Sequence, residues 1–356
     1  MPGKSRGAPV RVTCLHRRHL PLLPLAGAAS VVAAVWVRRV VLPGRPDDVG
    51  TLRPHRIPDP DARPSPDGQG VRLAVNPGSG PAWRSNPVDD LRKALPAADV
   101  RELRDGDDLK QVLGDRLSDD VVAVGAAGGD GTLSAAATVA LEHDRVLVAV
   151  PSGTFNHLAR DLGLDSPDDA VAAIRAGTVV HMDVGVVGGD DPRTFLNTLS
   201  FGGYTEVVDA RERLQPRVGK WLALAIALAR ELPRMEPLDL ELAGRRQPVW
   251  LGWIGNGRYA PDGFGPSWRE NLDDGLLDIR LVLGDRPWAR TRLVVEVLAG
   301  RLMKCPVYRE ERVESVAVVA HDGPLRLAVD GETFDGPARF TVSKQRRALA
   351  VAVAPA

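Results

Sequence analysis

Residues 121–134, VVAVGAAGGDGTLS, pass from an apolar run through a glycine turn into a helical pattern. The apolar part predicts a strand buried on both faces, and the pattern over 132–141 predicts a helix. The same succession begins with the apolar runs 71–76 (VRLAVN) and 146–151 (VLVAVP). Strands that alternate with helices in this way predict a parallel sheet assembled from βαβ units.

Each of these three predicted strands ends in a loop that contains glycine. The carboxyl ends of parallel strands meet at one edge of an open sheet, where such sheets bind ligands. Glycine lets the backbone approach a polyanion, and the amides that open the next helix supply donors. We therefore expect a nucleotide at the loops made by Asn76, Gly78, Ser79 and Gly80, by Gly128, Gly129, Asp130, Gly131 and Thr132, and by Gly153 and Thr154.

The aspartate inside the second loop predicts a metal ion. No G-x-x-x-x-G-K-[ST] occurs and no G-x-G-x-x-G opens the first helix, so main-chain groups must hold most of the phosphate. A carboxylate beside phosphate is repulsive unless a cation lies between them. Asp130 therefore indicates Mg²⁺, which binds carboxylate and phosphate oxygens. The alternative is that Asp130 only caps the helix that follows it.

The pattern changes from about Asp183 onward. Short strand-like runs at 248–255, 276–283 and 313–320 predict a mostly β domain, and helical patterns at 219–231 and 288–303 interrupt them. A chain of 356 residues is long enough for two domains. The fold class expected is thus α/β, with a Rossmann-like α/β/α nucleotide domain followed by a mostly β, sandwich-like domain.

The charges are divided unevenly although the formal net charge is zero. Eight of the 46 basic residues lie in residues 1–45, which hold no acidic residue, so the remaining 38 face all 46 acidic residues, a net of −8. An acidic body argues against nucleic acid as a partner. The two cysteines, Cys14 and Cys305, cannot form a disulfide framework, and a reducing, cytoplasmic setting is expected.

The first 70 residues differ from the rest of the chain. Residues 20–37 carry no charge and have arginines on both sides, so a membrane anchor, a cleavable signal peptide and a disordered start all stay open. Residues 43–70 contain seven prolines and predict an extended linker. The expected divisions are a basic, apolar leader (1–42), this linker, an α/β domain (71–185), a β-rich domain (186–320) and a C-terminal segment (321–356) that returns toward the α/β domain.

Six segments in order, NPGSG, GGDGTLS, PSGTFNHLARDLG, FLNTLSFGG, LDDGLLDI and VDGE, resemble the bacterial diacylglycerol kinase catalytic-domain family. The resemblance spans residues 71–356, and the family shares its superfamily with sphingosine, ceramide and NAD kinases. It implies a two-domain fold with ATP at the three glycine loops. It also implies a catalytic Mg²⁺ at Asp130 and Asp183, with His157 standing where the family has an acidic residue.

Two further sites come with the resemblance. Glu332 is implied as the general base and Asp330 as its essential neighbour, although Asp-Gly-Glu by itself is also a common hairpin turn. A structural Mg²⁺ is implied at the side chain of Asp274 and the backbone oxygens of Asn271 and Leu276. The alternative for that loop is a simple Asp-Gly turn between strands.

The leading hypothesis is an ATP- and Mg²⁺-dependent kinase that phosphorylates a hydroxyl of diacylglycerol or a related long-chain lipid at the inner face of the membrane. The alternatives are a kinase of a soluble acceptor, similar to the NAD kinases, and a nucleotide-binding regulatory protein without turnover. His157 and the unusual segment 260–268 motivate the last of these. The partner expected is a lipid acceptor, and the oligomeric state, including a homodimer, stays open.

Overall fold

The structure is a computed structural model that describes residues 63–78, 87–153, 156–203, 206, 210, 213–214, 236–260, 268–269, 271–285, 288–289 and 302–355. The predicted leader, most of the linker, the helix at 219–231 and most of the helix at 288–303 lie outside these residues, as do Ser79, Gly80 and Thr154. Within the described residues, no helix is both long and apolar enough to cross a membrane.

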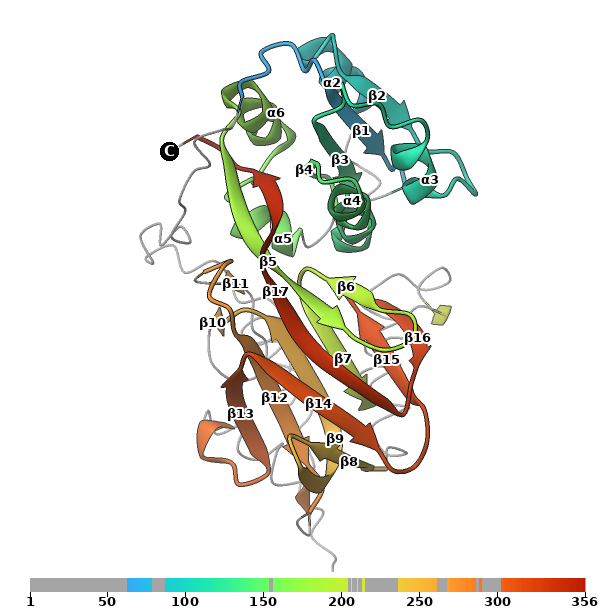
Figure 1. Cartoon of the computed structure of the whole chain (residues 1–356), viewed down its shortest axis with the longest axis vertical. Helices are drawn as coiled ribbons and strands as arrows, with labels where there is room; N and C mark the ends of the chain where they lie inside the picture. The colour runs from blue at the N-terminus through green and yellow to red at the C-terminus, as the bar shows by residue number, and fades with distance from the viewer. Residues whose placement is uncertain are drawn as a thin grey trace, which may run out of the picture. The chain divides into compact units, whose positions relative to one another are not determined.

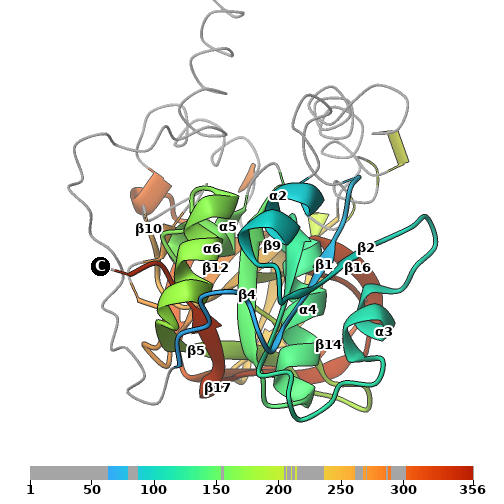
Figure 2. The same ribbon diagram turned by 90° about the horizontal axis from the view of Figure 1, so that it is seen from above.

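The first lobe is a parallel sheet between two helical layers. Its strands run in the order β4-β3-β1-β2, and their bounds are Val71–Val75 for β1, Asp99–Glu102 for β2, Ala123–Gly128 for β3 and Val146–Pro151 for β4. The helices are α2 (Val88–Ala94), α3 (Leu109–Gly114), α4 (Asp130–Glu142), α5 (His157–Asp161) and α6 (Pro167–Ala176). Helix α2 contacts α6 and α3 contacts α4, and Figure 2 shows the two pairs on opposite faces of the sheet. The predicted βαβ arrangement is confirmed.

Two predicted boundaries shift. The strand expected from residue 121 begins at Ala123, because Val122 precedes the sheet and is 56 % exposed. The helix expected from Thr132 begins at Asp130, which places this aspartate in the first turn instead of in the loop before it. The end of the predicted linker is also ordered, since the Ser65 amide donates to the Ile174 carbonyl of α6 at 3.2 Å.

The second lobe is antiparallel. Its principal strands are β7 (Thr198–Gly202), β8 (Leu238–Leu242), β9 (Arg245–Asn256), β12 (Leu277–Leu283), β13 (Tyr308–Val313), β14 (Ser315–Ala320), β15 (Leu325–Val329) and β16 (Glu332–Gly336). Shorter elements are β6 (Arg193–Phe195), β10 (Tyr259–Ala260), β11 (Trp268–Arg269) and a 3₁₀ turn at Leu302–Lys304. The single strand expected at 313–320 is thus two, divided at Glu314.

Two long strands belong to both lobes. β5 (Val179–Val187) and β17 (Arg339–Ala352) pair antiparallel along most of their length, with a break in register between Gln345 and Leu349. Before the break β17 also pairs with β14, and after it Val351 pairs with Leu147 of β4 (Figure 1). The end of β17 therefore lies within the sheet of the first lobe, and the ribbon of β5 and β17 connects two separate apolar cores.

Phe195 fills a space that a glycine leaves open in the second core. A Cβ placed on Gly185 would lie 2.2 Å from the Phe195 ring, and the two residues are register partners in β5 and β6. Phe195 is fully buried. The aromatic ring thus covers the backbone of β5 close to the point where β5 passes between the lobes.

Replacing Phe195 with alanine should lower the free energy of unfolding by about 3–5 kcal/mol, because it opens a cavity that the glycine cannot fill. Urea denaturation followed by circular dichroism measures the loss. The control is Val122→Ala, which shortens an exposed side chain and should cost no more than about 0.5 kcal/mol. A similar cost for both variants would contradict the proposed packing.

Candidate functional site

The three glycine loops lie at one edge of the parallel sheet. Val75 pairs with Ala127, and Gly128 pairs with Pro151, so β1, β3 and β4 end side by side. The second and third loops touch, because a Cβ on Gly153 would lie 2.4 Å from the Gly129 Cα. Their contact requires glycine, and it brings together the backbone groups that the sequence predicted would face phosphate.

Side-chain amides hold the first and third loops in shape. The Asn76 Oδ1 accepts from the Gly78 amide at 3.0 Å. In the third loop, the Gly153 amide donates to the Asn156 Oδ1 and the Asn156 Nδ2 donates to the Gly153 carbonyl, both at 2.9 Å. Asn156 has a φ of +50°, in the left-handed region that asparagine tolerates better than most residues. It precedes His157, the first residue of α5.

Asp130 does not cap its helix. It is the first residue of α4, Gly129 is the N-cap, and no side chain makes a capping hydrogen bond there. The Asp130 Oδ1 accepts a long hydrogen bond, 3.4 Å, from the Leu158 amide. Among the described residues this one long bond leaves carboxylate lone pairs open beside the glycine loops, which fits a Mg²⁺ that shares phosphate oxygens.

Asp330 and Glu332 stand on a tight hairpin between β15 and β16. Val329 pairs with Glu332, so Asp330 and Gly331 form the turn, with φ values of +48° and +94°. The hairpin turn, given above as the alternative interpretation of Asp-Gly-Glu, is therefore present. It also fixes where the side chains of the motif lie. Glu332 is exposed, and its Oε1 lies 3.5 Å from where a Cβ on Gly131 would be. The structure thus brings the Glu332 carboxylate to the glycine turn that opens α4.

The Asp330 carboxylate is held by three consecutive backbone amides. Leu196 donates to it at 2.8 Å, and Asn197 and Thr198 each donate at 2.9 Å. Burial raises the pKa of Asp330 above its usual value, and these amide bonds and one from the Ser134 hydroxyl oppose the rise. Ser134 lies on α4, so this carboxylate links the hairpin to the helix that carries Asp130. Of the two carboxylates, that of Asp330 is tied to the backbone and that of Glu332 is exposed.

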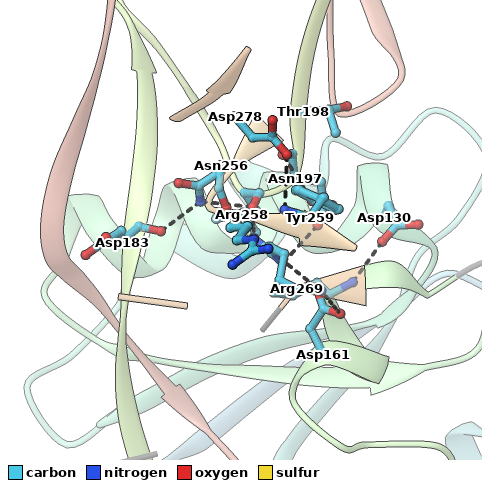
Figure 3. A network of polar contacts seen from close by, with 12 residues as sticks. Asp130, Asp161, Asp183, Asn197, Thr198, Asn256, Arg258, Tyr259, Arg269 and Asp278 are labelled. Atoms are coloured by element: carbon cyan, nitrogen blue, oxygen red, sulfur yellow. Dashed lines mark hydrogen bonds and ion pairs between the residues drawn. The ribbon is translucent and has the colours of Figure 1, made fainter. Parts of the chain in front are cut away.

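A buried arginine that the sequence did not single out organises this region (Figure 3). The Arg269 Nε donates to the Asp161 Oδ2 at 2.6 Å, and both side chains are buried. The same guanidinium donates to the Leu196 carbonyl at 2.6 Å and to the Asn197 Oδ1 at 3.3 Å. Leu196 and Asn197 are residues whose amides hold Asp330, so Arg269 connects α5 to the hairpin.

The arginine remains a cation in this setting. Burial acts to lower the pKa of Arg269, but the charge of Asp161, the hydrogen bond to it and the charge of Asp330 raise the pKa above its ordinary value. Burial raises the pKa of the nearby Tyr259 hydroxyl, which stays protonated and donates to the Asn197 carbonyl at 3.2 Å. No local sequence signal marks Arg269, because an isolated arginine is most often exposed.

The second carboxylate predicted for the catalytic Mg²⁺ has protein partners. Asp183 accepts from the Gly275 amide at 2.8 Å and the Arg347 amide at 2.7 Å, and it pairs with the Lys344 Nζ at 3.0 Å. In Figure 3 Asp183 and Asp130 lie on opposite sides of the network. Asp183 therefore does not fit a Mg²⁺ site shared with Asp130. Within the described residues, no three histidine, cysteine or acidic side chains gather around a common point.

The diacylglycerol kinase catalytic domain family matches residues 70–187. A protein of Xanthomonas euvesicatoria named "Probable lipid kinase YegS-like" is 30% identical over 260 residues, which are 69% of this chain and 83% of that protein. A protein of Mycobacterium tuberculosis named diacylglycerol kinase is 28% identical over 265 residues, 70% of this chain and 85% of that protein. A crystal structure of a diacylglycerol kinase from Bacillus anthracis superposes with a TM-score of 0.56 at 19% identity, covering 81% of this chain and 97% of that one.

Replacing Asp161 with alanine should lower the free energy of unfolding by about 3–5 kcal/mol, because the buried charge of Arg269 loses its counter-ion. Urea denaturation measures the change. The control is Asp335→Ala, which breaks the exposed 3.2 Å ion pair with Arg326 and should cost no more than about 1 kcal/mol. Equal losses in the two variants would contradict the structural role given to Arg269.

Proposed function

Because this chain belongs to the diacylglycerol kinase catalytic-domain family of lipid kinases, we propose that it transfers the γ-phosphate of ATP to a hydroxyl of diacylglycerol or a related long-chain lipid. The observation that carries the proposal is the approach of Glu332 to Gly131. It joins a carboxylate suited to accept a proton to loops suited to hold phosphate. The two motifs lie about 200 residues apart in the sequence, and the fold brings them together.

The glycine loops supply the nucleotide-binding part of the proposal. Backbone amides at Gly129 and Gly131 stand at the start of α4, where the helix dipole favours an anion. The contact between Gly129 and Gly153 excludes side chains from this edge, so a triphosphate can approach the main chain closely. Mg²⁺ bound at Asp130 would neutralise charge that develops on the phosphate oxygens.

Glu332 is the proposed general base. Its carboxylate is exposed beside α4, where an acceptor hydroxyl could lie between it and a phosphate held by the loops. As the bond between the acceptor oxygen and the γ-phosphorus forms, the bond from that phosphorus to the β-phosphate oxygen breaks and ADP leaves, and the hydroxyl proton passes to Glu332. Asp330 fixes the direction of this side chain, because its own carboxylate is tied to the amides of residues 196–198.

Because the proposed acceptor is a long-chain lipid, we expect the proposed reaction to take place at a membrane surface. Residues 1–45 carry eight basic and no acidic residues, a charge that favours an anionic leaflet over the acidic remainder of the chain. We expect a cytoplasmic protein that associates with the inner face of the membrane through this leader. The leader acts in targeting only, so it need not contribute to the chemistry.

Glu332→Gln should lower the initial rate of phosphate transfer to diacylglycerol by about 10²-fold or more, because the amide cannot accept the proton. Full-length protein, ATP labelled at the γ-phosphate and mixed micelles measure the rate, and labelled ATP retention measures nucleotide binding, which should persist. The control is Glu142→Gln, an exposed glutamate at the end of α4. Transfer by the wild type to NAD but to no lipid, or an undiminished rate in Glu332→Gln, would contradict the proposal.

Replacing Arg17, Arg18, Arg38 and Arg39 together with glutamine should weaken binding of the full chain to vesicles that contain anionic lipid, because each arginine near such a surface contributes about 1 kcal/mol. Vesicle flotation measures binding, and neutral vesicles are the control. Retention of full binding by the variant would assign membrane contact to the remainder of the chain.

A further inference from the structure

Three oxygens from distant parts of the chain surround one ammonium group. The Lys344 Nζ lies 3.0 Å from an Asp183 oxygen and 3.0 Å from the Asp274 Oδ1, and it donates to the Leu276 carbonyl at 3.1 Å. The Lys344 side chain is 2% exposed and that of Asp183 is fully buried. An ammonium has three hydrogens to donate, so this lysine is fully satisfied by these three acceptors.

We propose that the Lys344 ammonium is a built-in cation that takes the place of the divalent ion predicted at Asn271, Asp274 and Leu276. The Asp274 side chain and the Leu276 carbonyl are two of the three ligands predicted for that ion, and both bind the lysine instead. Mg²⁺ draws oxygen ligands to about 2.1 Å and carries two charges, so it cannot share these buried oxygens with an ammonium.

Each of the two carboxylates also accepts hydrogen bonds from two backbone amides. Asp183 accepts from the Gly275 amide at 2.8 Å and from the Arg347 amide at 2.7 Å. Asp274 accepts from the amides of Arg258 and Leu276, both at 2.9 Å. These bonds stabilise the ionised carboxylates, and the lysine supplies the positive charge that their burial requires. The residues present therefore fit an ammonium and do not fit a second Mg²⁺.

The lysine lies one residue before a bulge in β17. The register of β17 against β5 breaks between Gln345 and Leu349, and Arg347 has a φ of +49° within the break. From the same bulge, the Arg347 guanidinium donates to the Asp273 Oδ2 at 3.2 Å. A Cβ on Gly275 would lie 2.8 Å from the Arg346 Cζ. Three basic residues of one strand thus enclose the 273–276 loop, the part that a metal ion would otherwise organise.

The cation also acts on the proposed catalytic hairpin through the backbone of Asp183. The Asn256 Nδ2 donates to the Asp183 carbonyl at 2.8 Å and to the Leu196 carbonyl at 3.0 Å. The amide of Leu196 is one of the three that hold Asp330. Lys344 is therefore a positioning residue, and this role is independent of whether the chain phosphorylates a lipid.

The test uses the full chain without nucleotide or lipid, and it measures thermal unfolding in EDTA and in millimolar Mg²⁺. Because the Mg²⁺ proposed at Asp130 shares its ligands with a nucleotide that is absent here, we expect the wild-type Tm to be the same in both. Lys344→Ala should lose several degrees in EDTA and regain much of this loss in Mg²⁺, because an ion can then enter between Asp183 and Asp274. The matched control, Lys110→Ala, replaces an exposed lysine of α3 and should change neither value.

Two outcomes would overturn the proposal. One is a wild-type Tm that rises in Mg²⁺ and no longer does so in Asp274→Asn. The other is a folded Lys344→Ala variant whose Tm falls without any recovery in Mg²⁺.

If Lys344→Ala does not fold, Mn²⁺ titration of the wild type by electron paramagnetic resonance decides: a bound ion lost in Asp274→Asn contradicts the proposal, and no such ion supports it. An ion lost only in Asp130→Asn belongs to the glycine-loop site and also supports it. None of these readings depends on kinase activity.

Discussion

The guanidinium of Arg269 is held inside the protein by one carboxylate and by oxygens of two other segments, and it determines how those segments face one another. Asp161 supplies the opposite charge from the end of α5, while the carbonyls of Leu196 and Asn256 come from the link between β6 and β7 and from the end of β9. A buried cation tolerates little displacement, because each lost partner leaves a charge without compensation. The interaction therefore orients the first lobe's helix relative to the second lobe's strands.

The hydrogen bonds around Arg269 also fix the position of the proposed catalytic hairpin. Leu196 and Asn197 accept hydrogen bonds from Arg269 and Tyr259, and the amides of residues 196–198 donate to Asp330. The Asp330–Gly331 turn is then set at both ends, by its pairing in the hairpin and by the amides that bind its carboxylate. Glu332 follows immediately and is placed beside Gly131 without a direct contact to Arg269. Backbone hydrogen bonds thus connect the buried ion pair of Arg269 and Asp161 to the position of the exposed Glu332 carboxylate.

Buried cations from side chains recur in this protein. Arg269 compensates Asp161, and Lys344 compensates Asp183 and Asp274. Both lie near the places where the two lobes share elements. A side-chain cation is carried by the chain itself and cannot dissociate, whereas a metal ion depends on its concentration in the surroundings. Asp130 differs from these aspartates, because its one long hydrogen bond leaves it open to a ligand.

Much of the α/β lobe could be predicted from sequence, because strand periodicity and turn composition are local properties. The apolar runs before Asn76, Gly128 and Ser152 indicate three parallel strands, and topology alone then places their loops at one edge. The Asp-Gly turn at 330–331 was likewise readable as a hairpin. A nucleotide at the loops and Mg²⁺ at Asp130 were predicted from the residues, whereas ATP, Asp183 as a ligand and Glu332 as the base came from the resemblance, and all of these stay predictions.

The partners of the charged side chains were decided only by the tertiary structure. Asp330 meets amides more than 130 residues earlier, and Lys344 meets Asp183 across 161 residues. Neither pairing leaves a local pattern, since a lysine in a strand or an arginine after a loop has the same sequence appearance when exposed. Burial determines which partners such charged side chains have, and burial depends on which strands become neighbours. The sequence by itself determined the strands and loops, and the crossing of β5 and β17 between the lobes determined which charges those loops would meet.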